Sequence, residues 1–361
     1  GMSIRNRLLL GYVGVIVILM ASGALVIDRM SDELEGAVRR DAQALSTTLR
    51  EKIDLALRSR IQSIQAFAGT SSTLQDALIA SNVDFAGRGM AADVRAEIHE
   101  IDEAWKAAKG RIPLAQELLD NHVSAALRRT MAFHHENEGR PVFAEIFVTG
   151  AWGVNVGQTG RTTDYLQSDE PFWKEAWANG LWVSDEVTKD ESAQVHSLDI
   201  GVRVDGPDGV PFGVLKAVLN ITDIRETIDS FAQRSGLRDA FLELVDARGS
   251  VVHRQGDDEA FGRDLSAQGA VQRVLRGERG TVVETIAGAE LLRAYAPAAV
   301  GAPPPRWSLV LNQRTSVVFE HADELRTWMI GVGILASLAA TLLGFFLSRS
   351  FAGVTQRLAV A

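Results

Sequence analysis

The chain has 361 residues, of which 46% are apolar and 23% are charged, so it is neither a disordered chain nor a collagen-like one. It contains no cysteine, which excludes thiol catalysis, cysteine-ligated zinc and a disulfide framework. The formal net charge of −9 argues against nucleic-acid binding, because neutralising phosphates needs a basic face. A length prior of roughly 150 residues per domain gives about two domains.

Two long uncharged stretches predict two membrane-spanning helices. Residues 8–27 contain no charged side chain, and a helix of this length measures ~30 Å, the thickness of the hydrocarbon core of a bilayer. The stretch is long for the apolar part of a cleaved signal peptide, and Ala21-Ser22-Gly23 is a poor cleavage site, so we expect a retained span. The second predicted span covers residues 327–348, with Trp328 as an anchor at the membrane interface.

Arginines flank both spans on the sides that face away from the segment between them. Arg5 and Arg7 lie in the first seven residues, and Arg349 and Arg357 follow the second span. Positively charged flanks stay in the cytoplasm, so residues 28–326 are expected outside it, which in a bacterium means the periplasm. Because these arginines contribute +4 to a net charge of −9, the outer segment carries −13. The sequence therefore predicts a two-pass protein of the inner (cytoplasmic) membrane, a plan that suits sensing or tethering better than transport.

The segment after the first span continues as a helix. From Met30 to Ile64, apolar residues recur mostly at spacings of three and four between charged residues, which is the pattern of a helix with one buried stripe. One long helix is therefore expected to project outward from the membrane. Its stripe packs either on its own domain or on a second copy of the chain, and the pattern leaves both possibilities open.

Residues 71–136 keep the helical pattern, with breaks at Gly87–Gly89 and Gly110–Pro113. The run His134-His135-Glu136 offers metal-ligating side chains, but adjacent residues on a helix point in different directions and zinc needs ligands that converge. We expect a polar helix end there and no metal site. The long helix and these helices together form a predicted helical stalk and helical segment, residues 28–140.

From residue 142 onward the apolar pattern takes the two-residue period of β-strands. Strands are predicted at 142–148, then, after a turn around Gly150–Gly153, through Val156, and further on at 182–184, 195–204 and 212–221. An amphipathic helix is predicted at 169–179, and Gly180 ends it. A shorter version of this order follows, with strands at 241–245 and 251–254, a helix at 267–276, and strands at 281–286, 291–296 and 307–313. The fold class predicted is α+β, with two small modules in series and a connecting helix at 316–326 before the second span.

The sequence of the first module resembles a known family of sensors. The residues are AEIFVT at 144–149, TDYLQSDEPFW at 163–173, SLDI at 197–200 and GVLKAV at 213–218. They are similar to the membrane-distal half of double Cache (dCache) domains, the extracytoplasmic sensors of chemoreceptors, sensor histidine kinases and diguanylate cyclases.

The resemblance covers roughly residues 28–326 and is strongest at 142–222. It implies two PAS-like antiparallel-sheet modules on a long helix, a membrane-distal one at 141–234 and a membrane-proximal one at 235–315. The tail, residues 349–361, resembles the start of a HAMP linker without its usual proline, and we expect the chain to be truncated before an output domain.

The resemblance also implies a ligand pocket in the distal module, between its sheet and the segment from Tyr165 to Trp173. Amino-acid binders of the family share a pattern of Tyr, four residues, Arg, one residue, Trp-Tyr, two residues and Ala, followed later by Asp. In this chain Tyr165 matches the tyrosine, Phe172 and Trp173 match the aromatic pair, and Ala176 matches the alanine.

Two positions depart from that pattern. Glu170 stands where the arginine belongs and Asn220 where the late aspartate belongs. Arginine's planar fork grips an α-carboxylate through two hydrogen bonds, whereas a glutamate repels it, so we expect a ligand other than an ordinary α-amino acid. If Asp169 and Glu170 dominate the pocket, the ligand is a cation, a polyhydroxyl compound or an amide-bearing molecule.

Two further side chains are candidates for the same site. Strand alternation places Lys216 on the face of Asn220, where it either neutralises Glu170, grips an anion or is simply solvated. His196 lies near the same strands and is either an ordinary core or surface histidine or a pH-responsive group.

The favoured function is a receptor subunit that senses a small solute in its distal module, acts as a homodimer and needs no cofactor. A membrane-tethered enzyme is disfavoured, because the sequence has no nucleophile elbow and no His-Glu-x-x-His pair. A tether that binds another periplasmic protein stays as the alternative. In a tether, the aromatic cluster of the distal module, Trp152, Trp173, Trp177 and Trp182, would be closely packed and leave no room for a solute.

Overall fold

The computed structural model describes residues 4–190, 195–299 and 303–358; the ends of the predicted cytoplasmic flanks, residues 1–3 and 359–361, lie outside this range. The helices are α1 (Ile4–Thr70), α2 (Ser72–Gly87), α3 (Ala91–Ala107), α4 (Pro113–Asp120), α5 (His122–Glu138), α6 (Pro171–Asn179), α7 (Thr222–Arg234), α8 (Gly269–Leu275), α9 (Thr315–Val318) and α10 (Glu320–Leu358), with a short 3-10 helix, η1 (Asp258–Ala260). The strands are β1 (Phe143–Gly150), β2 (Asn155–Gln158), β3 (Leu181–Val183), β4 (Thr188–Asp190), β5 (Val195–Asp205), β6 (Pro211–Asn220), β7 (Ala240–Val245), β8 (Val251–Arg254), β9 (Gly280–Ile286), β10 (Ala289–Ala296) and β11 (Ser308–Arg314).

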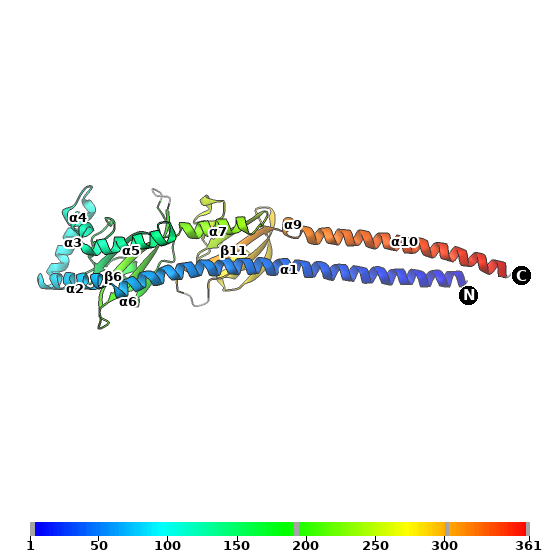
Figure 1. The fold of residues 1–361 in the computed structure, drawn as a ribbon, viewed down its shortest axis with the longest axis horizontal. Coiled ribbons are helices and arrows are strands. Elements are labelled where there is room, and N and C mark those ends of the chain that lie inside the picture. Colours follow the sequence, from blue (N-terminus) through cyan, green and yellow to red (C-terminus); the bar gives the residue numbers. More distant parts are fainter. Residues whose placement is uncertain (1–3, 191–194, 300–302, 359–361) are drawn as a thin grey trace.

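One helix of 67 residues, α1, organises the whole molecule. Two sheet modules lie in series along its outer half, and α2 to α5 gather at the far end (Figure 1). The stripe predicted from the three-and-four spacing is buried, with residues such as Leu49, Ile53 and Ile64 at 0–3% exposure. These side chains pack on the strands of both sheets, so this part of the stripe is used within the chain itself.

The two ends of the chain form an apolar pair of helices. Part of α1 (Leu10–Thr70) and part of α10 (Ala322–Phe346) are long and apolar enough to cross a membrane. The two helices run side by side away from the modules (Figure 1), and the Tyr12 hydroxyl donates a hydrogen bond to the Ala340 carbonyl. Two candidate spans therefore flank the modules, as the sequence predicts.

The distal module is a six-stranded antiparallel sheet in the order β2-β1-β6-β5-β3, with β4 paired to β5. Strand alternation sends one set of side chains, including Ile146, Ile200 and Leu215, onto α1 and the helices beside it. The opposite face is covered by α6, which rests directly on β5 because Gly201 has no side chain: a Cβ there would lie 2.9 Å from the carbonyl oxygen of Phe172.

The proximal module is a five-stranded antiparallel sheet in the order β8-β7-β11-β10-β9. Its first face packs on α1, and its second face is covered by the short helix α8. The helix α7 joins the two modules and contacts both sheets (Figure 1). The last strand, β11, continues directly into α9 and α10. The predicted fold, a long N-terminal helix that carries two antiparallel-sheet modules, is confirmed.

Candidate ligand-binding site

The strand register arranges the distal sheet's second face in rows. One row runs across four strands as Gln158, Phe147, Lys216 and Gly201, because each of these residues is paired with the next. The neighbouring row consists of Glu145, Val218 and Asp199, and the row on the other side contains Asn155, Thr149 and Val214. Paired residues share a face, so all these side chains lie on the side that α6 covers.

The roof above the middle row is α6. Phe172 is buried, lies edge-on to Phe147 with 5.8 Å between ring centroids, and packs with Ala176 and Val214. Trp173 donates a hydrogen bond from Nε1 to the Thr149 hydroxyl at 2.9 Å, which ties the helix to β1. The segment forms a helix here because Pro171 suits the first turn and Gly180 adopts a positive φ of 88° just after the last turn.

Lys216 of β6 places a positive charge next to the apolar side chains of α6. Its ammonium lies 4.8 Å from the centroid of the Phe172 ring and 2.9 Å from the carboxylate of Asp199. Glu145, in the same row as Asp199, is half-buried, and its burial raises the pKa of its carboxyl group; Asp199 adds to this rise and Lys216 opposes it. These two carboxylates outnumber the one ammonium, and the guanidinium of Arg203 on the same face is paired with Asp205.

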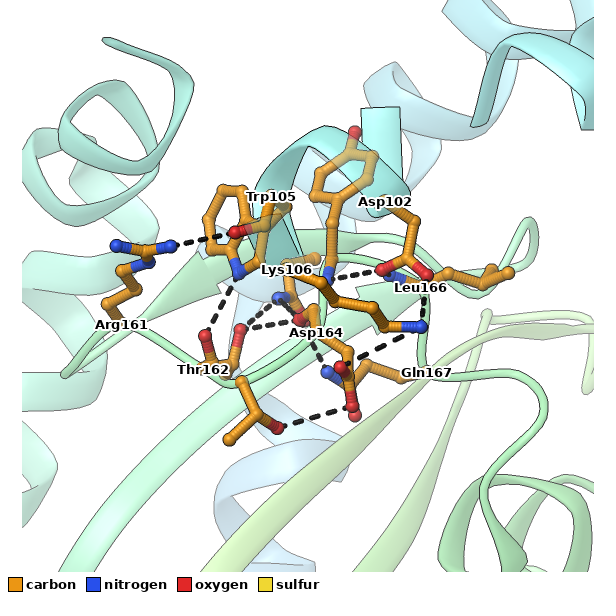
Figure 2. Close-up of polar contacts among 11 residues, drawn as sticks. Asp102, Trp105, Lys106, Arg161, Thr162, Asp164, Leu166 and Gln167 are labelled. Carbon is orange, nitrogen blue, oxygen red and sulfur yellow. Dashed lines mark hydrogen bonds and ion pairs between the residues drawn. The ribbon is translucent and has the colours of Figure 1, made fainter. Parts of the chain in front are cut away.

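The loop between β2 and α6 is held in place by the helix α3 (Figure 2). Asp102 is 1% exposed, and its Oδ1 accepts hydrogen bonds from the backbone N–H groups of Tyr165 at 2.9 Å and Leu166 at 3.0 Å. Its Oδ2 pairs with Lys106 at 2.6 Å. Trp105, three residues later on the same face of the helix, donates its indole N–H to the carbonyl of Thr162 at 2.9 Å.

The sheet holds the same loop from below. Asn155 donates from Nδ2 to the Thr162 hydroxyl at 2.7 Å and to the Asp164 carbonyl at 3.1 Å, and Gln167 donates to that carbonyl at 2.7 Å. At the start of the loop, the Thr159 hydroxyl accepts a hydrogen bond from the Ile146 N–H at 2.9 Å. The loop is therefore fixed over β2 by contacts from both sides.

Polar atoms without partners lie on this enclosed face. Gln158 is 0% exposed, yet neither its amide nitrogen nor its amide oxygen has a hydrogen-bond partner. The Oδ1 atom of Asn155, in the adjacent row, also lacks one. Leaving a buried donor or acceptor unpaired costs about 1–3 kcal/mol, so such groups need an explanation in a folded protein. A bound polar molecule that forms hydrogen bonds with these atoms would be such an explanation.

The structure places the predicted site residues in several different surroundings. Phe172, Trp173 and Lys216 come together on the α6 face of the distal sheet. Tyr165 is buried in the neighbouring cluster against Trp105, with ring centroids 5.6 Å apart, and burial raises the pKa of its phenol to about 12.

The remaining four predicted residues have other surroundings. The side chain of Asp169 is exposed, and Glu170 is the residue just before α6. Lys216, for which Glu170 is one predicted partner, pairs with Asp199 instead. Asn220 accepts a hydrogen bond from the Thr222 N–H at 2.9 Å and so shapes the start of α7, and His196 lies where the two modules meet.

Several residues of this face have no counterpart among the predicted site residues. Gln158, Asn155, Glu145 and Asp199 reach the face only through strand register. Asp102 acts from a helix that is distant in the sequence. Gln158 ends the short strand β2, whose sequence NVGQ is not apolar, so no pattern in the sequence marks it.

One group of acidic and imidazole side chains has ligand atoms close enough to share a metal ion. His99, Asp102 and Glu103 have such atoms within 4.8 Å of one another. Asp102, however, already uses one oxygen for two backbone N–H groups and the other for Lys106. Its carboxylate is therefore committed to holding the loop.

No family model and no curated protein matches the sequence. Similar solved structures include the extracellular domain of vpHK1S-Z8, assigned as a histidine kinase, with 13% identity over 81% of this chain and 98% of that one and a TM-score of 0.49. The ligand-binding domain of the Pseudomonas aeruginosa PAO1 amino acid chemoreceptor PctB, solved with L-Arg, has 18% identity over 68% and 99% and a TM-score of 0.42. The periplasmic sensory domain of the Campylobacter jejuni chemoreceptor Tlp1 has 10% identity over 62% and 90% and a TM-score of 0.40.

These solved structures are named as an extracellular domain, a ligand-binding domain and a periplasmic sensory domain. At these identities the likeness concerns the fold, so the function of this chain has to be inferred from its own contacts.

Proposed function

We propose that this chain is the sensing region of a two-pass transmembrane receptor, and that it binds a small solute on the α6 face of the distal sheet. The observation that carries the proposal is the completely buried amide of Gln158, which has no partner for its donor or its acceptor. It lies in the row next to the half-buried Glu145, under a loop that α3 and β2 hold in place. Ligand pockets combine apolar walls with a few such polar groups.

The charges on this face indicate the class of ligand. Glu145 and Asp199 outnumber Lys216, so the face favours a solute with a positive charge or several N–H or O–H donors. Arg203 is on the same face, but Asp205 and the Trp177 carbonyl already engage its guanidinium. An α-carboxylate would therefore find no free arginine among these side chains, and we propose an amine- or amide-bearing solute other than an ordinary α-amino acid.

The fold offers a route from this face to the membrane. The strand β6, which carries Lys216, ends just before α7, and the strand β5, which carries Asp199, begins beside α7; this helix packs on the proximal sheet. The proximal strand β11 leads through α9 into α10 and its candidate span. A signal along this route is a shift between two conformations of the chain. A solute shifts the equilibrium between them only by its difference in affinity for the two conformations, and a difference of about 5 kcal/mol gives a nearly complete switch. We propose that two copies act together, so that paired α10 helices carry the shift across an inner membrane to an output domain.

A protein-binding tether is the second candidate, and the close packing of Phe172, Ala176 and Phe147 favours it. A thermal-shift screen of the full chain in lipid nanodiscs separates the two functions. A receptor gains stability from some small solute, by about 2.7 kcal/mol at a hundred times its Kd, whereas a tether gains none. The compounds should include amines, amides, polyols and carboxylates.

Variants then locate the site. Gln158→Leu and Glu145→Gln should each weaken binding of the stabilising solute at least tenfold, whereas Gln116→Leu, on the exposed surface of α4, should not change it. If a solute is found and both site variants keep its affinity, the solute binds elsewhere and the proposed site is wrong.

A further inference from the structure

A polar cluster joins the two modules where they meet. It is centred on Arg225 of α7, whose guanidinium contacts one histidine from each module. Its Nη1 lies 2.8 Å from Nδ1 of His196 on the distal strand β5, and its Nε donates to Nδ1 of His253 on the proximal strand β8 at 3.1 Å. Both histidines are buried, at 2% and 3% exposure.

These contacts fix the protonation of both rings. A guanidinium only donates hydrogen bonds, so Nδ1 of each histidine must be an unprotonated acceptor. His253 then carries its proton on Nε2, which lies 2.8 Å from the carboxylate of Asp229. His196 carries its proton on Nε2, a buried atom with no partner. Both imidazoles are therefore neutral in this arrangement, and a proton added to either Nδ1 would face an N–H of Arg225.

The surrounding charges act in the same direction for His196. Burial is the main cause that lowers the pKa of His196, and Arg225, Lys189 of β4 and His253 act in the same direction while Asp258 of η1 opposes them, which together bring it to about 4. The ring of Phe261 covers its edge with 4.6 Å between centroids. Burial also lowers the pKa of His253, against the opposing effects of Asp229 and Asp258.

The other polar contacts between the modules are weak by comparison. The ion pairs Glu186–Arg248 and Asp185–Arg306 connect the same modules, but their side chains are 47–62% exposed, and the Asp258 side chain, with which Arg225 also pairs, is 77% exposed. Exposed pairs contribute little to stability. Among the described residues, the contacts of Arg225 with His196 and His253 are therefore a buried polar link between the modules that contains titratable rings.

We propose that His196, Arg225 and His253 form a proton-operated clamp, which holds the two modules together while both imidazoles are neutral and opens when either one takes up a proton. Because each pKa is lower in the folded state than in the unfolded chain, the stabilisation is complete above about pH 6.5 and is lost as the pH falls toward 4. The clamp lets acidification outside the membrane alter the junction through which a distal signal must pass, without any solute in the distal module.

Distance measurements between spin labels test this directly, because the chain has no native cysteine. Ala178→Cys on α6 and Gln272→Cys on α8 are exposed positions, one in each module. In the full chain in nanodiscs, without solute, the label distance should be narrowly distributed at pH 7.5. A second, displaced population should grow reversibly as the pH falls from 6.5 to 4. An unchanged distribution over this range would overturn the proposal.

Substitutions identify the groups that respond. Glutamine offers Arg225 an acceptor that does not titrate, so the double variant His196→Gln/His253→Gln should stay in the narrow population at pH 4. Arg225→Met should show the displaced population already at pH 7.5. His134→Gln is the matched control, because burial lowers the pKa of that histidine too, but it lies against Ser63 within the distal module. It should respond to pH as the wild type does.

The carboxylates of Asp229 and Asp258 also contact this cluster, and the double glutamine variant keeps both of them. A pH response that persists in this variant would therefore assign the change to the carboxylates and refute the clamp.

Discussion

Replacing Asp102 tests whether α3 really fixes the loop over the distal sheet. In Asp102→Ala, the backbone N–H groups of Tyr165 and Leu166 lose their acceptor, and Lys106 loses its ion pair. An orphaned N–H costs about 1–3 kcal/mol, with the larger cost where water cannot reach it. Tyr165 is buried and Leu166 is partly buried, so we expect the loop to be destabilised by about 2–4 kcal/mol.

Hydrogen exchange measures this loss locally, which suits a chain with two modules. The amides of Asn155 and Gln167 are the reporters, because they donate to the Tyr165 and Gly153 carbonyls and make no bond to Asp102. At about 1.4 kcal/mol per factor of ten, their exchange in Asp102→Ala should be about 30- to 700-fold faster.

Two control variants separate the hydrogen bonds from the charge. Asp102→Asn keeps an oxygen for both N–H groups and should accelerate exchange only about fivefold. Lys106→Ala removes a half-exposed ion pair and should change it by no more than that. If Asp102→Ala leaves the two reporters within threefold of the wild type, or if Lys106→Ala accelerates them equally, the loop is held by something other than these hydrogen bonds.

Two substitutions elsewhere in the fold have expected outcomes of their own. Arg293→Met removes the guanidinium 3.1 Å from the buried carboxylate of Glu243 and leaves it the Asn312 amide and the more distant Arg254, so we expect the proximal module to lose about 3 kcal/mol, measured as faster exchange of the β10 amides. Unchanged β10 exchange would count against that ion pair. Gly201→Ala places a Cβ 2.9 Å from the Phe172 carbonyl, so α6 must move away from β5, at about 1–3 kcal/mol. Its amides should then exchange faster, while those of α8 serve as the unaffected reference.

Most of the fold could be predicted because the two periodicities are strong. The apolar stripe of α1 and the alternation in β5 and β10 each bury one face, and the predicted boundaries fall within a few residues of those observed. The helix α7 was missed, although Ile224 and Ile228 have helical spacing and are buried. The sequence pattern predicts that the strand continues to residue 221. In the structure, the side chain of Asn220 accepts a hydrogen bond from the Thr222 N–H, where the strand ends and the helix begins.

Less of the candidate site could be predicted, because it depends on pairing between strands. Phe172 and Trp173 stand out as a local aromatic motif, and they do lie on the roof. Gln158 carries no motif, and its position beside Phe147 depends on the register of β1 and β2, which shifts between Val148 and Thr149. A shift of one residue would send the side chain to the opposite face of the sheet.

The two modules use the same face of their sheets in opposite ways. In the proximal module, Arg293 fills this face: it donates to Asn312 at 2.6 Å, to Glu284 at 2.9 Å and to Glu243 at 3.1 Å.

The Asn312 amide also donates to Glu243 at 3.0 Å, so this buried network satisfies its own charges. In the distal module, Lys216 neutralises Asp199, while Glu145 and the amide of Gln158 remain for another molecule. A buried charge that already has its partners resists displacement, whereas an unpaired polar group gains from any partner that reaches it. The proximal network is therefore suited to keeping a fixed geometry, and the unpaired groups of the distal module support the proposal that a solute binds there. On that proposal, α7, which contacts both sheets, sets how strongly the two modules are coupled.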